Sequence, residues 1–221
     1  MVNILMSILM LIGGYAGYVV LQRPDFFPIQ HVTLGVRLQR VLPAEVLKVV
    51  RRELQGNFFT ADISHLRLAL EKLPWVRHIN IRRDFPNRIV VELEEYQALA
   101  RWNHHELINQ QGEVFMATNV KLKELPLFIA PAGTERQVVL GYLKFSQQLA
   151  GLQLSIKQLT LSPRHAWQLR LSNDIVLELG RSEMTQRLDR FVAVYPYSLA
   201  NQFNTVKQVD LRYRNGFAVE W

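Results

Sequence analysis

The spacing of hydrophobic residues changes along the chain, and each spacing predicts a different kind of structure. Val2 to Gln22 is an unbroken stretch without a charged side chain, and Arg23 is the first charged residue. At 1.5 Å per residue, such a stretch forms a helix of about 31 Å, which matches the hydrocarbon thickness of a bilayer. We therefore predict a transmembrane signal anchor over residues 1–23.

A cleaved signal peptide and a buried helix of a soluble protein are the alternatives for this segment. A signal peptide has a cationic start and a small-residue cleavage site. Here no Lys or Arg precedes the apolar core, and residues 15–22 contain no A-x-A pattern. A buried soluble helix rarely runs so long without a charge. Composition leaves the orientation of the helix open, because large domains cross membranes largely regardless of flanking charge.

The following section mixes strand and helix periodicities in the order β-α-α-β-β. Strands are expected at residues 29–34, 76–83 and 89–93, and helices at residues 43–54 and 62–73. Pro43 suits the first turn of a helix, and alternation in the last two strands marks one buried face. The strand positions expected to face the helices are Ile79, Ile81, Ile89, Val91 and Leu93. This order predicts one domain over residues 27–96.

Beyond residue 97, short strand-like runs alternate with turn residues, and two helices interrupt them. Thr134 and Gln137 have capping-box spacing, Gly151 occupies the place of a C-terminal cap, and Pro196 is expected to end the second helix. We expect a mainly antiparallel β domain with flanking helices over residues 97–221, and an α+β fold class for the whole chain. Strands are expected at residues 98–102, 106–108, 114–116, 156–161, 167–171 and 175–179, and helices at residues 135–150 and 183–195.

The end of the chain predicts a β-hairpin. Residues 209–214 and 217–221 alternate on either side of Asn215-Gly216, a pair typical of a type I′ turn with positive φ at both positions. A terminal strand is often a sheet edge with free backbone groups, and this one is rich in the aromatic and Arg residues found at binding hot spots. The alternative is that Tyr213 and Trp221 pack in the domain core.

Charge and composition argue against several classes of function. The net charge is +7, but the basic residues are dispersed, which favours a solvated surface over a nucleic-acid site. The chain has no Cys, no G-x-S-x-G and no Gly-rich phosphate loop, and its six His residues form no H-E-x-x-H motif. Glu92 and Glu94 lie on the outward face of an amphipathic strand. We therefore expect no catalytic residues, no metal and no cofactor.

Several runs of residues resemble the FtsQ/DivIB family of cell division proteins. The resemblance extends from the apolar segment to the last residue, and it identifies residues 27–96 as a POTRA domain. In the first domain and the start of the second, the matching runs are Gly56–Asp62, Leu73–Val76, Ile81–Pro86 and Ala100–Asn103. In the second domain they are Trp167–Leu169, Leu179–Arg181, Arg190–Val192, Tyr195–Pro196, Val209–Tyr213, Asn215–Val219 and Trp221.

The resemblance implies a non-enzymatic divisome scaffold that links early and late steps of septum assembly. It implies a single-pass, N-in protein of the inner membrane, with most of the chain in the periplasm at the division septum. Its expected partners are FtsB and FtsL, with FtsB adding a strand to the terminal hairpin; no nucleic acid or small-molecule substrate is implied. The implied partner-binding residues are Arg181, Arg212, Tyr213, Asn215, Gly216, Phe217 and Trp221.

Three other functions were weighed against this one. A POTRA-type adaptor of another envelope assembly would need a β-barrel or tandem POTRA units, for which the chain is too short. A periplasmic enzyme acting on the cell wall would need a nucleophile or a metal motif. A membrane-tethered nucleic-acid binder is suggested by net charge alone.

Overall fold

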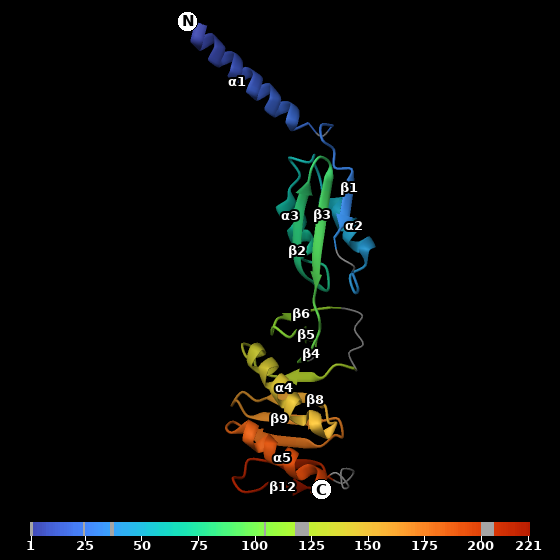
Figure 1. The fold of residues 1–221 in the computed structure, drawn as a ribbon, viewed down its shortest axis with the longest axis vertical. Coiled ribbons are helices and arrows are strands. Elements are labelled where there is room, and N and C mark those ends of the chain that lie inside the picture. Colours follow the sequence, from blue (N-terminus) through green and yellow to red (C-terminus); the bar gives the residue numbers. More distant parts are fainter. Residues whose placement is uncertain (1, 24, 36–37, 104, 118–123, 200–205) are drawn as a thin grey trace. The chain divides into compact units, whose positions relative to one another are not determined.

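The protein divides into two compact units, Met1–Tyr96 and Gln97–Trp221 (Figure 1). The computed structural model describes residues 2–23, 25–35, 38–103, 105–117, 124–199 and 206–221. Both units contain helices and strands that do not alternate regularly, so the fold class is α+β, as the sequence predicts. We describe each unit by itself.

The first element is the helix α1 (Val2–Leu21), 20 residues long. Its described apolar side chains are largely exposed, including Leu9, Leu11 and Ile12. Within the described part of the chain, no helix combines the length and the hydrophobicity that crossing a membrane requires.

The rest of the first unit has the predicted order β-α-α-β-β. Strand β3 is central in a three-stranded sheet, pairing with β1 in parallel and with β2 in antiparallel fashion. Helices α2 and α3 cover one face of this sheet (Figure 1). The elements are β1 (His31–Leu34), α2 (Pro43–Glu53), α3 (Ile63–Leu70), β2 (Val76–Asp84) and β3 (Arg88–Glu95).

Periodicity decides which face of each element is buried. The Asp62 side chain caps α3 by accepting the backbone N–H of His65 at 2.9 Å, and Leu66 and Leu70 of that helix are fully buried. In the sheet, Ile79 lies opposite Leu93 and Ile81 opposite Val91. The predicted inward face is confirmed, because Ile79, Ile81, Ile89, Val91 and Leu93 are all buried.

The carboxylate of Glu95 ties the end of β3 to the segment before α2. It accepts the backbone N–H groups of Gln39 at 3.0 Å, Arg40 at 2.9 Å and Val41 at 2.7 Å. Partial burial would raise the pKa of Glu95, but these hydrogen bonds outweigh it and hold the pKa below its usual range. The Arg40 guanidinium lies over the Trp75 ring, 4.3 Å from its centroid, which fixes the same segment a second time.

The second unit is a nine-stranded sheet in the order β12-β11-β10-β9-β8-β7-β4-β5-β6. The pairs β4–β7, β7–β8 and β10–β11 are parallel, and the other described pairs are antiparallel. The strands are β4 (Ala100–Trp102), β5 (Glu106–Ile108), β6 (Val114–Phe115), β7 (Leu127–Ile129), β8 (Ile156–Leu161), β9 (Trp167–Leu171), β10 (Val176–Gly180), β11 (Gln208–Asp210) and β12 (Ala218–Glu220).

Two helices, α4 (Glu135–Leu149) and α5 (Met184–Ser198), pack on one face of this sheet (Figure 1). Phe145 of α4 meets Trp167 edge to face, with ring centroids 5.4 Å apart. Gly141 lets the helix approach this closely, because a Cβ there would lie 2.6 Å from a ring carbon of Trp167. Phe191 of α5 is fully buried in the same core.

Local helix-end signals were less reliable than periodicity. Thr134 precedes α4 but does not cap it; its Oγ1 donates to the Pro131 carbonyl at 2.6 Å instead. Gly151 does not cap the helix either, because it lies within a 3₁₀ turn (Ala150–Leu152) and Gln153 adopts the left-handed conformation. Pro196 lies inside α5, whose last turn continues with the Leu199 N–H bonded to the Tyr195 carbonyl at 3.0 Å.

We predict that Ile81→Asp unfolds the first unit. The side chain is buried against the helices, so the carboxylate would be desolvated without a partner, at a cost on the order of 4 kcal/mol. His31→Asp is the matched control, because it puts the same group at an exposed strand position opposite Arg88. Urea titrations followed by circular dichroism compare them, and wild-type stability of Ile81→Asp would disprove the register.

Candidate functional site

The terminal strand β12 is an edge of the nine-stranded sheet. It pairs with β11 on one side, through Val219 opposite Val209, and no described strand pairs with its other side. An edge strand presents a row of backbone N–H and C=O groups that a further strand can use. The predicted edge is therefore present.

The predicted two-residue turn is wrong. Asp210 pairs with Ala218, so residues 211–217 form a seven-residue connection, and neither Asn215 nor Gly216 has a positive φ. The pairing of β11 with β12 ends at Asp210 and Ala218, because the next residue, Leu211, is buried in the core. Leu211 is buried and donates its N–H to the Glu178 carbonyl at 3.0 Å.

The aromatic side chains of this region divide between core and solvent. Phe217 is partly buried and packs against the core of the second unit. Tyr213 is 58% exposed and Trp221 is 53% exposed. The alternative that Tyr213 and Trp221 are core residues is thereby excluded, and both offer rigid contact area beside the edge strand.

Two basic side chains that the sequence analysis missed hold this region in place. Arg190 of α5 donates through Nη2 to the Tyr213 carbonyl at 3.0 Å and through Nη1 to the Arg214 carbonyl. Lys207 Nζ donates to the Trp221 carbonyl at 2.6 Å. The sequence could have indicated Arg190, because it lies three residues after Arg187 on a predicted helix and the two side chains therefore share one face.

Arg212 is already paired within the chain. Its Nε lies 2.8 and 3.1 Å from the two carboxylate oxygens of Asp210, and its Nη2 lies 2.7 Å from one of them. The hydrogen bonds from Arg212 hold the pKa of Asp210 below its usual range, although partial burial works against them. The same contact raises the pKa of Arg212. A spacing of two residues on a predicted strand places Asp210 and Arg212 on one face, so the pair was foreseeable.

Gly180 makes room for the arginines at the end of β10. It lies at a bulge with φ +75°, and a Cβ there would be 2.8 Å from Arg187 Nη1 and 3.2 Å from Arg212 Cγ. Arg187 Nη1 donates to the Leu179 carbonyl at 2.7 Å. Arg181, the next residue, is exposed, and its side chain makes no hydrogen bond or ion pair with the described residues. Of the expected arginines, Arg181 is therefore the one whose side chain has no partner among the described residues.

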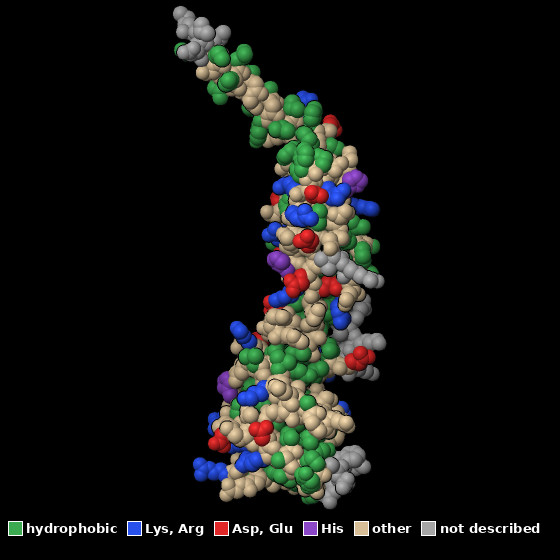
Figure 2. Space-filling model, in the orientation of Figure 1, with side chains coloured by type: hydrophobic (Ala, Val, Ile, Leu, Met, Phe, Trp, Pro, Cys, Tyr) green, Lys and Arg blue, Asp and Glu red, His purple; other side chains and the backbone are tan. Residues whose placement is uncertain are grey.

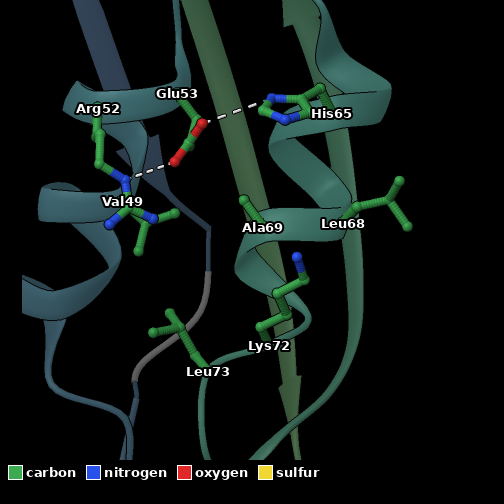
Figure 3. Close-up of a pocket in the computed structure, with 8 residues that line it drawn as sticks. All are labelled: Val49, Arg52, Glu53, His65, Leu68, Ala69, Lys72 and Leu73. Carbon is green, nitrogen blue, oxygen red and sulfur yellow. Dashed lines mark hydrogen bonds and ion pairs between the residues drawn. The ribbon is translucent and has the colours of Figure 1, made fainter.

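A hollow lies between α2 and α3 in the first unit (Figure 3). The Glu53 carboxylate lies 2.5 Å from Arg52 Nε and 3.6 Å from His65 Nδ1. The described residues contain no group of three or more His, Cys, Asp or Glu that could hold a metal ion. The hollow measures about 380 Å³ and is lined by Val49, Arg52, Glu53, His65, Leu68, Ala69, Lys72 and Leu73.

Comparison with known proteins points to one family over both units. The family model described as cell division protein FtsQ/DivIB, C-terminal, matches residues 100–212, and the model described as POTRA domain, FtsQ-type, matches residues 27–96. Several proteins named cell division protein FtsQ are similar to the chain. That of Coxiella burnetii is 34% identical over 217 residues, covering 98% of this chain and 89% of that protein.

The relatives from two other bacteria give the same result. The cell division protein FtsQ of Burkholderia pseudomallei is 37% identical over 221 residues, covering 97% of this chain and 88% of that protein. That of Nitrosospira multiformis is 40% identical over 181 residues, covering 82% of this chain and 76% of that protein.

We predict that Asp210→Asn lowers stability at neutral pH by about 1 kcal/mol, a size typical of a partly exposed ion pair. The pKa of Asp210 is depressed in the folded state. Its contribution is therefore complete above the ordinary value of 3.8 and is lost as the pH falls through the folded pKa. Urea titrations at pH 7 and near pH 2 should show the difference between wild type and variant shrinking in acid.

The control for this prediction is Asp174→Asn. Asp174 forms an exposed pair with Lys157 at 2.9 Å, so its replacement should change stability little at either pH. A penalty for Asp210→Asn that stayed constant down to pH 2 would show that the charge of Asp210 does not stabilise the fold.

Proposed function

Because the chain belongs to the FtsQ/DivIB family of cell division proteins, we propose that it is a non-enzymatic divisome scaffold that binds FtsB and FtsL. Its place is the inner membrane at the division septum, where it links early and late steps of septum assembly. The observation that carries this proposal is the free edge of β12, flanked by the exposed rings of Tyr213 and Trp221.

In this proposal, FtsB adds a strand to β12. Backbone hydrogen bonds along the edge supply affinity for an extended segment of nearly any sequence, so flanking side chains have to supply the specificity. Tyr213 and Trp221 offer large surfaces with few rotatable bonds, and the hydrogen bonds from Arg190 and Lys207 already hold the backbone of both. The loop is thus largely preorganised, which lowers the entropic cost of binding.

The charge of this region favours an acidic segment in the partner. The Arg181 guanidinium can donate two parallel hydrogen bonds to a carboxylate of the partner. Arg212 holds Asp210 through Nε and Nη2, so it fixes the loop, and its remaining N–H groups can donate to a partner carboxylate. Asn215, Gly216 and Phe217 complete the proposed site, with Asn215 and Gly216 exposed on the connection and Phe217 fixing it to the core.

The remaining chain fits this scaffold role. We propose that residues 27–96 act as the POTRA domain and residues 97–221 as the partner-binding β domain. Within the described residues, the carboxylates near the hollow of Figure 3 and at the end of β3 are held by neighbouring groups rather than paired for acid–base chemistry. A POTRA-type adaptor of another envelope assembly is the alternative, and loss of the FtsB interaction without loss of division would favour it.

We further propose that residues 1–23 anchor the protein in the membrane with the N-terminus inside. The support is the uncharged sequence from residue 2 to 22, the helical form of residues 2–21, and the exposure of apolar side chains such as Leu9 and Leu11. No helix in the described part of the chain meets the length and hydrophobicity that a membrane span requires, so the proposal rests on the sequence of the segment and on these exposed apolar side chains.

We predict that Tyr213→Ala and Trp221→Ala each weaken binding of a soluble FtsB fragment by on the order of 2 kcal/mol, roughly thirtyfold in affinity. Truncating an exposed ring removes contact area from the partner without opening a core cavity, so both variants should melt as the wild type does. The measurement is a calorimetric titration of the detergent-solubilised chain, with a melting curve for every variant.

Tyr197→Ala is the matched control for these titrations. Tyr197 is 91% exposed and belongs to α5 of the same unit, but it does not lie on the edge strand or its connection. Its loss should leave the affinity unchanged, as should Glu92→Ala on the outward face of the first unit. A folded Tyr213→Ala chain that bound FtsB at wild-type affinity would move the site elsewhere.

We predict that alkaline carbonate leaves the full-length chain in the membrane pellet. A helix whose apolar side chains lie in lipid is not released by high pH, whereas a protein held at the surface by charge is. Replacing Leu11 with Arg, which places a charge in the middle of the segment at a cost of roughly 3 kcal/mol, should move part of the chain to the supernatant. Quantitative release of the unaltered chain would end the anchor proposal.

A further inference from the structure

Five phenylalanines of the first unit gather beside the end of α1, and four of them are exposed. The exposed fractions are 46% for Phe26, 36% for Phe27, 48% for Phe59 and 68% for Phe85, whereas Phe58 is buried. They come from three segments: the connection after α1, the loop between α2 and α3, and the turn between β2 and β3. We call these five residues the phenylalanine cluster.

Four rings of the cluster contact one another. Phe27 meets Phe59 edge to face at 5.2 Å between centroids, and Phe58 meets Phe59 at 5.3 Å and Phe85 at 5.8 Å in the same way. Phe27 also lies 6.2 Å from Phe85. Single exposed apolar residues are ordinary on a protein surface, but a contiguous group of aromatic rings marks an interaction site.

Asn57 ties the cluster to the end of α1. This side chain is fully buried, and its Nδ2 donates to the Leu21 carbonyl at 2.6 Å and to the Arg23 carbonyl at 2.9 Å. The last carbonyls of a helix have no partner within the helix, so Asn57 caps α1 from the loop between α2 and α3. Its Oδ1 in turn accepts the N–H of Phe59 at 2.9 Å.

A second hydrogen bond ties the same loop to the connection after α1. The Phe58 N–H donates to the Phe27 carbonyl at 2.9 Å. Chain length alone also limits the separation, since the five Cα-to-Cα steps from Leu21 to Phe26 span at most about 18 Å. The cluster therefore lies next to the point where the chain leaves α1, and Figure 2 shows hydrophobic side chains gathered there.

We propose that the phenylalanine cluster inserts into the interfacial layer of the bilayer, beside the end of α1. This inference rests on the proposed membrane anchor, because an anchored α1 brings its last turn to the boundary between hydrocarbon and head groups. Trp and Tyr are enriched at that depth, and amphipathic helices that lie on membranes bury Trp, Phe and Leu at the boundary between head groups and acyl chains. The exposed Arg23 beside the cluster can contact lipid phosphates.

Lipid is the occupant that the position of the cluster favours over a protein partner. The rings belong to turns and connections and offer no free strand edge for a partner to extend. Their hydrogen-bonded link to α1 keeps them near the membrane whatever else the chain binds. Insertion would also hold the first unit against the bilayer surface rather than leave it to rotate freely about its connection.

The test places single cysteines in the full-length chain, which has no native Cys. Phe59→Cys and Phe85→Cys carry a bimane label, and the chain is reconstituted into vesicles of phosphatidylethanolamine and phosphatidylglycerol that contain a nitroxide lipid. Leu11→Cys reports on the helix. Leu68→Cys is the matched control, because Leu68 is 59% exposed on α3 but lies outside the cluster.

We expect the nitroxide lipid to remove most of the fluorescence at positions 11, 59 and 85 and to leave position 68 unchanged, with melting curves of the variants matching the wild type. Quenching at position 11 alone would overturn the inference and leave the anchor proposal intact. No quenching at position 11 would overturn both. Equal quenching at position 68, or protection of positions 59 and 85 from a soluble thiol reagent only in native membranes and not in vesicles, would also overturn the inference.

Discussion

The parallel pairing of β11 with β10 decides what the end of the chain presents to solvent. Val209 lies opposite Leu177 in this pair, and both are fully buried. A parallel neighbour cannot be reached by a tight turn, so the chain crosses over through α5 before β11 begins. Once β11 is in place, β12 can add only on its outer side, and the sheet acquires an edge formed by the last residues of the chain.

The same pairing explains the arrangement of charge beside that edge. Asp210 ends β11 and is partly buried, so it needs a partner, and Arg212 provides one two residues later. Gly180 at the end of β10 leaves the space that this guanidinium and that of Arg187 occupy. Arg212 is thus paired within the chain, whereas Arg181 is exposed and has no hydrogen-bond partner among the described residues. This division could not be read from a count of arginines.

In the first unit, the buried side chain of Asn57 connects the end of α1 to the loop between α2 and α3. Its Nδ2 donates to the Leu21 carbonyl, and its Oδ1 accepts the N–H of Phe59 in the loop that carries Phe58 and Phe59. A buried side-chain amide needs hydrogen-bond partners for both its oxygen and its nitrogen. The proposed membrane contact follows from this hydrogen bonding. Each unit therefore presents aromatic rings to solvent on a segment whose backbone is hydrogen-bonded to a neighbouring side chain.

Periodicity in the sequence predicted most of the helices and strands, and in the first sheet it also predicted the buried face. The alternation through Ile79, Ile81, Ile89, Val91 and Leu93 predicted the inward face of the first sheet. These are local properties, since the period of a strand or helix follows from its own backbone geometry. The resemblance of short runs to one family added the order of the domains, and the comparisons confirmed that family.

Tertiary structure alone decided the register and the partner of each polar group. Asn215-Gly216 is a strong turn signal. Leu211 is nevertheless buried and Phe217 packs against the core, so the last strand pair is Asp210 with Ala218. Strand β7 was not predicted, and pairing with β4 and β8 on its two sides holds it in the sheet. Thr134 does not cap α4, because its hydroxyl donates to the Pro131 carbonyl instead. Such choices depend on groups distant in sequence, which compete for the same hydrogen bonds and the same space in the core.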